Sequence, residues 1–211
     1  MIGPMRTVIL VAPYFPPLAR VGALRPLKIA RHLGAHGWRA VVLALPPGGG
    51  AIDWSLADAV PPDVVVDRSY AGGPLWWIES RSRTTDMTPG GRHGGAAAGP
   101  RPPWKRLADR ARESVDDCTP VAGRLPRVPR AVARAVRLAR EHRAEAIMAC
   151  GDPWSGLVAG SAAARIAGLP FVADLRDPWT LEPERFRAKP WAVKALERRV
   201  EAAVVRSASR V

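Results

Sequence analysis

The segment that most constrains the fold is residues 6–45, where two apolar runs flank an amphipathic stretch. The first run, RTVILVAPYF, is continuously apolar and rich in β-branched residues, which is typical of a strand buried on both faces of a parallel sheet. ALRPLKIARHLGAHGW follows, with apolar residues at helical spacing and Gly37 as a stop signal. RAVVLAL then predicts a second buried strand, so this segment predicts a right-handed βαβ unit.

The alternation of strands and helices continues in the rest of the chain. We expect strands at DVVVD, AEAIMAC and PFVADL, and helices at WKRLADRARESV, RVPRAVARAVRLAREHR, SGLVAGSAAARIAGL and WAVKALERRVEAAVVRSA, with a further strand expected at SRV. The predicted fold class is α/β: a doubly wound, mostly parallel Rossmann-like sheet with helices on both faces, forming one domain over residues 1–211. Gly156 and Gly160 give a GxxxG pattern, but Arg165 favours close packing of this helix on the sheet over a membrane helix.

Residues 69–103 differ from the rest of the chain in composition. Gly, Pro, Ala and Arg dominate there, which predicts a mobile loop. Trp76, Trp77 and Ile78 form a small exposed apolar patch within it. This patch fits either a docking point for a partner or membrane surface, or a flap folded onto the core.

The composition excludes several classes of protein. Two cysteines without a CxxC, and four histidines away from strand ends, argue against a disulfide framework, a metal site or a cofactor. No G-x-G-x-x-G, Walker or G-x-S-x-G motif is present.

The net charge of +13 fits either attraction to an anionic partner or a scattered arginine-rich composition. The sequence has no basic stripe with interleaved aromatics, which argues against nucleic-acid binding. No apolar run reaches the roughly 18–20 residues of a membrane span. The low cysteine content fits a reducing cytosol, so we expect a cytoplasmic protein, peripheral at the inner membrane face if its charge meets anionic lipid.

The tripeptide Asp-Pro-Trp occurs twice, each time after a predicted strand. The copies are Asp152–Trp154 and Asp177–Trp179. Ligands of open parallel sheets bind outside the carboxyl ends of the strands, so both copies and the loop after the first strand are candidate site segments. Helix capping also accounts for the aspartates and prolines. The tryptophans Trp154 and Trp179 fit packing against a sugar, a lipid or a partner domain.

Charged residues cluster next to the second copy. Asp174, Arg176 and Asp177 lie within ADLRDPW, and strand alternation places Asp174 and Arg176 on one face. A structural ion pair and an active-site role are both consistent with this arrangement.

Several of these segments together resemble family-four glycosyltransferases of GT-B fold. YFPPLARVGALRPLKIARHLGAHGW resembles the start of that family, and GLPFVADLRDPW is similar to a GLPWVADFRDPW block in one of its branches. LAREHRAEAIMAC and ALERRVEAAVVRSASRV resemble further elements of the amino-terminal, acceptor-side domain. The resemblance covers residues 6–50 and 128–211, and it implies a missing carboxyl-terminal donor domain.

The resemblance implies roles for individual residues. Asp174, Arg176 and Asp177 are the implied catalytic group, with Arg176 and Asp177 near the acceptor hydroxyl. The implied substrate-binding residues are Tyr14, Arg20, Gly22, Arg25, Asp152, Trp154 and Trp179, with Gly22 in the turn that approaches the donor phosphates. The family has paired glycines where this chain has Ala19 and Arg20. Either the Arg20 guanidinium replaces that backbone contact, or the contact is lost.

The resemblance therefore predicts transfer of a sugar from a nucleotide-sugar donor, which is a substrate and not a cofactor, to a sugar or lipid-linked acceptor. Because the donor domain is missing, we expect the chain to be inactive alone. The alternative is a non-catalytic truncated or split module that docks on a partner domain.

Overall fold

The computed structural model describes residues 5–47, 51–70, 121, 125–151, 153–176, 179–181, 186 and 189–210, and the backbone of 85–86. Its centre is a five-stranded parallel sheet of order β4-β2-β1-β6-β7, built from β1 (Arg6–Val11), β2 (Trp38–Leu43), β4 (Val65–Asp67), β6 (Ala146–Cys150) and β7 (Phe171–Asp174). The expected strands at these segments are confirmed. The expected helix in residues 104–115 lies outside the described residues.

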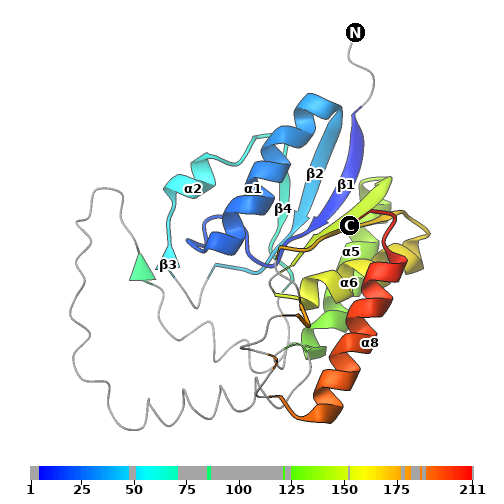
Figure 1. Ribbon diagram of the computed structural model, residues 1–211. Coiled ribbons are helices and arrows are strands. Elements are labelled where there is room, and N and C mark those ends of the chain that lie inside the picture. The colour runs from blue at the N-terminus through cyan, green and yellow to red at the C-terminus, as the bar shows by residue number, and fades with distance from the viewer. Residues whose placement is uncertain are drawn as a thin grey trace, which may run out of the picture.

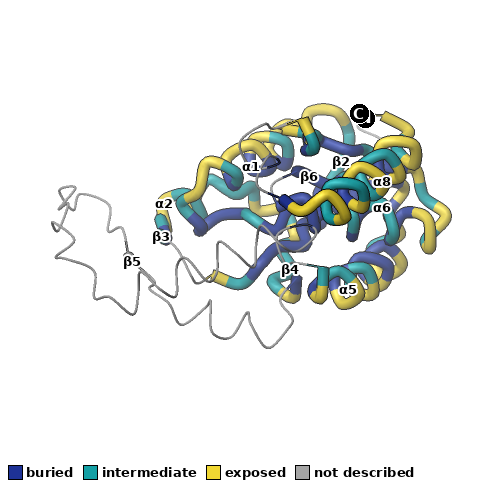
Figure 2. Tube along the Cα trace, turned by 60° about the horizontal axis from the view of Figure 1, so that its bottom comes forward, coloured by how far each residue is buried: buried dark blue, intermediate teal, exposed yellow. Residues whose placement is uncertain are grey.

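Helices cover both faces of this sheet, so the doubly wound fold class is confirmed (Figure 1). On one face α1 (Val21–Leu33) buries Leu27 and Ala30 against Leu10 and Val42. On the other face α5 (Val128–Glu141) and α6 (Ser155–Ala167) pack together over the central strands, and α8 (Trp191–Ser207) packs against α6. Figure 2 shows the buried strands between helices whose outer sides are exposed.

The first helix ends as the sequence predicts. A 3-10 turn, η1 (Gly34–His36), follows α1, and Gly37 adopts a left-handed φ of 73°. Glycine accepts this conformation without a steric cost, which explains why it stops the helix. The amphipathic pattern over 127–143 is likewise confirmed, with α5 preceded by η3 (Leu125–Arg127).

A second, two-stranded sheet and a short helix lie outside the main sheet. β3 (Ala51–Ile52) pairs with β5 (Thr85–Asp86), and α2 (Ser55–Asp58) follows β3. Most of the predicted 69–103 loop, including Trp76 and Trp77, lies outside the described residues. Its first part differs from the prediction, because Tyr70 is buried and its hydroxyl contacts Ser155 Oγ at 3.2 Å.

The end of the chain approaches the free edge of β7. Arg210 forms a parallel bridge with Val172, and its carbonyl accepts a hydrogen bond from the Ala173 N–H at 3.0 Å. Of the expected further strand at 209–211, Ser209 and Arg210 contact β7, and Val211 lies outside the described residues.

Close packing of α6 on the sheet explains its glycines. A Cβ at Gly160 would lie 2.6 Å from Ala149 Cβ and 3.0 Å from Phe171 Cε2, and one at Gly156 would lie 3.0 Å from Pro13 Cδ. No room exists for a methyl group at Gly160. The sequence interpretation of helix-on-sheet packing is confirmed.

We expect Gly160→Ala to reduce the free energy of unfolding by about 1–3 kcal/mol, because the methyl group overpacks the core. Urea unfolding measures this change. Gly34→Ala is the matched control, because Gly34 has a helical φ of −57° and a Cβ at this position would meet no atom within 4 Å. An equal effect of both substitutions would contradict the packing account.

Candidate active site

The topology brings the candidate loops to one place. β1 lies between β2 and β6, and the chain builds the sheet outward from it in both directions. The carboxyl ends of β1 and β6 thus form the topological switch point, where open α/β sheets bind ligands. β6 and β7 are neighbours joined by α6. We call the loops at this edge, residues 12–20, 151–154 and 175–181, the carboxyl rim.

An ion pair connects α1 to the last strand across this switch point. Arg25 Nε donates to Asp174 Oδ2 at 2.9 Å, and Arg25 Nη2 donates to Asp174 Oδ1. The Asp174 side chain is only 7% exposed, whereas that of Arg25 is 54% exposed. The sequence pattern suggested Arg176 as a partner of Asp174, but the bidentate partner is Arg25. Arg176 itself is exposed on the rim.

A buried thiol lies beside this pair. Cys150 and Asp174 are register partners in β6 and β7. Burial, followed by the charge of Asp174 and a hydrogen bond to it, raises the pKa of the Cys150 thiol well above its ordinary value. The thiol is therefore neutral at physiological pH and unsuited to act as a nucleophile.

A second arginine covers the aromatic residue of the first loop. The Arg20 guanidinium carbon lies 4.8 Å from the ring centroid of Tyr14, which is a cation–π distance. Arg20 is exposed and immediately precedes α1, while Gly22 lies half-buried in the first turn of that helix. Tyr14, Arg20, Gly22 and Arg25 therefore lie on one continuous stretch of the chain at the rim.

The two tryptophans meet, but not as open platforms. Trp154 and Trp179 stack with ring centroids 5.5 Å apart and planes inclined by 9°. They are 9% and 1% exposed and belong to the larger core cluster, against which Tyr14 packs. The shared location on the rim is as predicted. The broad exposed apolar face expected of each side chain is wrong, because each ring covers the other. Asp152 and Asp177 lie outside the described residues.

Sequence reasoning missed one residue that organises the rim. Arg68 follows β4 and donates hydrogen bonds to the carbonyl of Pro16 and, at 3.3 Å, to that of Leu45. It thereby fixes the loop after β1 to the loop after β2, and burial lowers the pKa of its guanidinium. The local sequence does not predict this role, because an arginine that follows a strand usually has a solvated side chain.

At the carboxyl end of the outer strand β4, Asp67 makes several polar contacts. Arg134 on α5 donates to Asp67 Oδ2 through Nε at 3.0 Å and Nη2 at 2.6 Å, and the Ser69 N–H donates to Oδ1 at 2.9 Å. Burial alone would raise the pKa of Asp67, but the hydrogen bonds from Arg134 and Ser69 outweigh it and lower the pKa below the ordinary value of 3.8.

This depressed pKa gives a pH-dependent prediction. A carboxyl with a folded-state pKa below its unfolded value stabilises the fold above that unfolded value, and the contribution disappears as pH falls through the folded-state pKa. We expect Asp67→Asn to cost about 1–3 kcal/mol at pH 7 and less near pH 3. Unfolding at both pH values measures it, with the exposed Asp58→Asn as control. A cost that does not shrink in acid would contradict the assignment.

Within the described residues, no group of three or more His, Cys, Asp and Glu side chains could hold a metal ion. Across those same ranges, the helices are all too short or too polar to cross a membrane.

The fold is similar to that of known glycosyltransferases. SsfS6, a glycosyltransferase of Streptomyces sp. SF2575, aligns with 95% of this chain at 16% identity and a TM-score of 0.42, and the chain covers 46% of it. SsfS6 complexed with thymidine diphosphate aligns with 92% of this chain at 15% identity and a TM-score of 0.43, and the chain covers 43% of it. SnogD, a glycosyltransferase from Streptomyces nogalater, aligns with 93% of this chain at 17% identity and a TM-score of 0.41, and the chain covers 41% of it. The chain thus spans less than half the length of these proteins. No protein-family model and no curated protein sequence matches it.

Proposed function

We propose that the chain is the acceptor-side half of a family-four-like glycosyltransferase, which moves a sugar from a nucleotide-sugar donor to a sugar or lipid-linked acceptor. The observation that carries the proposal is the convergence of the YFPP loop, the first turn of α1 and the ADLRDPW block at one switch point, linked by the Arg25–Asp174 pair. These are the segments that resemble the family. A donor domain is the partner this proposal requires.

Sugar transfer places two chemical requirements on the residues of this rim. A nucleoside diphosphate leaving group needs positive charge or oriented N–H donors, and an acceptor hydroxyl benefits from a nearby base. Arg20 and Arg176, both exposed on the rim, are suited to the first task. Asp177 is our proposed base, because the resemblance of the ADLRDPW block implies a position near the acceptor hydroxyl. A lipid-linked acceptor would bring this face to an anionic membrane, in keeping with the net charge of +13.

A non-catalytic docking module is the second candidate, and exposed apolar side chains favour it. Val21 and Trp54 are 69% and 55% exposed, although both are large and apolar. Val21 begins α1 at the rim, and Trp54 follows Asp53, whose N–H donates to the Pro17 carbonyl. Such side chains are suited to contact with a partner domain.

We expect these 211 residues alone to transfer no sugar, because on this proposal they form the acceptor-side half and the donor binds to the other half. The measurement is release of nucleoside diphosphate from common nucleotide sugars in the presence of mixed sugar and lipid-linked acceptors. A protein that joins the chain to a nucleotide-sugar-binding α/β half is the positive arm. Transfer by the chain alone would contradict the two-half account, and no transfer by the joined protein would favour the docking module.

A further inference from the structure

The Arg25–Asp174 pair differs from two other described ion pairs in how its two ends are exposed. Lys189 and Glu197 are both buried, at 5% and 0% side-chain exposure, as expected for a structural pair. Arg6 and Glu145 are both open to solvent, at 55% and 48%. In the rim pair the carboxylate is buried at 7% while the guanidinium remains 54% exposed. The aspartate therefore belongs to the interior and the arginine to the surface.

The geometry of the pair leaves part of the guanidinium available. Asp174 accepts hydrogen bonds from Nε and from one N–H of Nη2. A guanidinium carries further N–H donors on Nη1 and Nη2, and these are directed away from the carboxylate that occupies the Nε edge. That second edge matches the paired oxygens of a phosphate or carboxylate group. Because Asp174 already fixes the plane of the fork, a ligand would lose less of the side chain's conformational freedom on binding.

The surroundings favour an anion over a neutral ligand. Arg20 and Arg176 are both exposed on the carboxyl rim, on the segments that flank Arg25 and Asp174. In the strands β1, β6 and β7 that lead into the rim, Asp174 is the only acidic residue, and both of its oxygens accept hydrogen bonds from Arg25. The pair also lies at the switch point, which is where open α/β sheets bind their ligands.

We propose that Arg25 binds an oxyanion of the substrate, a phosphate or carboxylate group, and that Asp174 is the positioning residue that orients it. The inference rests on the proposed function for the identity of that substrate. It also changes the role of Asp174 from the catalytic one that the sequence resemblance implies. A general base must reach the hydroxyl whose proton it takes, whereas the Asp174 side chain is only 7% exposed and both of its oxygens face the Arg25 guanidinium.

The test is binding to the ¹⁵N-labelled chain, observed at the arginine Nε–H resonances. The probes are uridine diphosphate, glucose 1-phosphate and, as a neutral control, glucose. We expect a phosphorylated probe to shift the Arg25 Nε–H signal in a saturable manner, and glucose to leave it unchanged. If no phosphorylated probe shifts that signal, or if glucose shifts it equally, the proposal is overturned.

Variants separate the fork geometry from simple charge. Arg25→Lys keeps the charge but loses the fork, and we expect it to weaken probe binding about 10-fold or more. The control is Arg31→Lys, at an exposed position in the last turn of the same helix, which should leave the affinity unchanged. Equal affinities of the wild type and Arg25→Lys would overturn the proposal.

Asp174→Asn provides a test of sign. The substitution makes the chain more positive, so charge alone predicts tighter binding of an anion. Positioning predicts weaker binding, because the carboxamide cannot accept both hydrogen bonds and the fork is released. A well-dispersed ¹H–¹⁵N spectrum shows that the variant is folded, and the Arg25→Lys result stands if it is not. Tighter binding by folded Asp174→Asn would overturn the positioning role.

The two probes distinguish the source of the oxyanion. Binding of glucose 1-phosphate at Arg25 indicates a phosphorylated sugar, and binding of uridine diphosphate alone indicates the nucleotide. Both outcomes support the oxyanion site. Failure of the proposed function is a separate result, since it would appear as absent sugar transfer by the joined protein with anion binding at Arg25 intact.

Discussion

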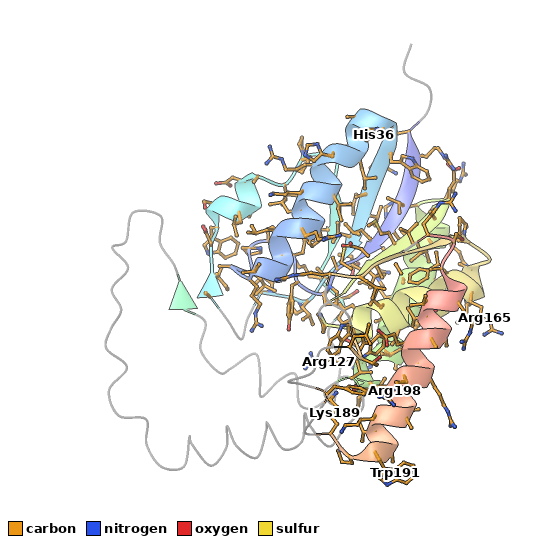
Figure 3. All side chains as sticks on the ribbon, in the orientation of Figure 1. His36, Arg127, Arg165, Lys189, Trp191 and Arg198 are labelled. Carbon is orange, nitrogen blue, oxygen red and sulfur yellow. The ribbon has the colours of Figure 1, made fainter. Side chains whose placement is uncertain are left out.

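Replacing Lys189 with methionine is expected to lower the free energy of unfolding by about 3–5 kcal/mol, the scale of a buried charge left without its partner. Lys189 Nζ donates to Glu197 Oε1 at 2.6 Å, and the Val121 N–H donates to the same oxygen at 2.8 Å. Glu197 is 0% exposed, and its Oε2 atom has no hydrogen-bond partner in the part of the chain that the structure describes. Without the ammonium group, this carboxylate would be buried with one backbone donor. Figure 3 labels Lys189 beside the first turns of α8.

Urea unfolding of the wild type and of Lys189→Met measures this loss.

Two further variants complete this experiment. Lys28→Met removes an exposed lysine from α1 and should change the stability by less than about 0.5 kcal/mol. The double variant Lys189→Met with Glu197→Leu should recover much of the loss, because an apolar pair of similar volume replaces the ion pair. Loss of the acceptor for the Val121 N–H limits that recovery. A loss in Lys189→Met no larger than in Lys28→Met would contradict the assignment.

The sheet and its helices follow from local patterns in the sequence. Strands β1, β2, β6 and β7 are continuous apolar runs because they are buried on both faces. Helix α6 coincides with the small-residue stretch. It ends at Ala167 because Gly168, the next residue, adopts a left-handed φ of 68°. The carboxyl rim was predictable for the same reason, since strand ends fix where the loops meet.

The contacts within the rim were not predictable from local patterns. Arg25 and Asp174 are separated by 149 positions in the chain, and their pairing depends on how α1 is placed over the sheet. The stacking of Trp154 on Trp179 likewise depends on the spacing of two loops, and it reverses the exposure that each tripeptide suggests alone. Strand alternation favours a nearby partner for Asp174, whereas tertiary packing supplies a distant one.

The most direct test of the central claim, that the carboxyl rim is the acceptor side of a sugar-transfer site, is turnover by a joined two-half protein carrying Asp177→Asn. We expect turnover to fall about 10²-fold or more, the scale of a lost general base, with the melting temperature unchanged. Turnover and melting temperature are measured on the same preparation, with the exposed Asp58→Asn as the matched control. If Asp177 only caps the chain after β7, the opposite result follows: a lower melting temperature with full turnover per folded molecule. That result would contradict the account.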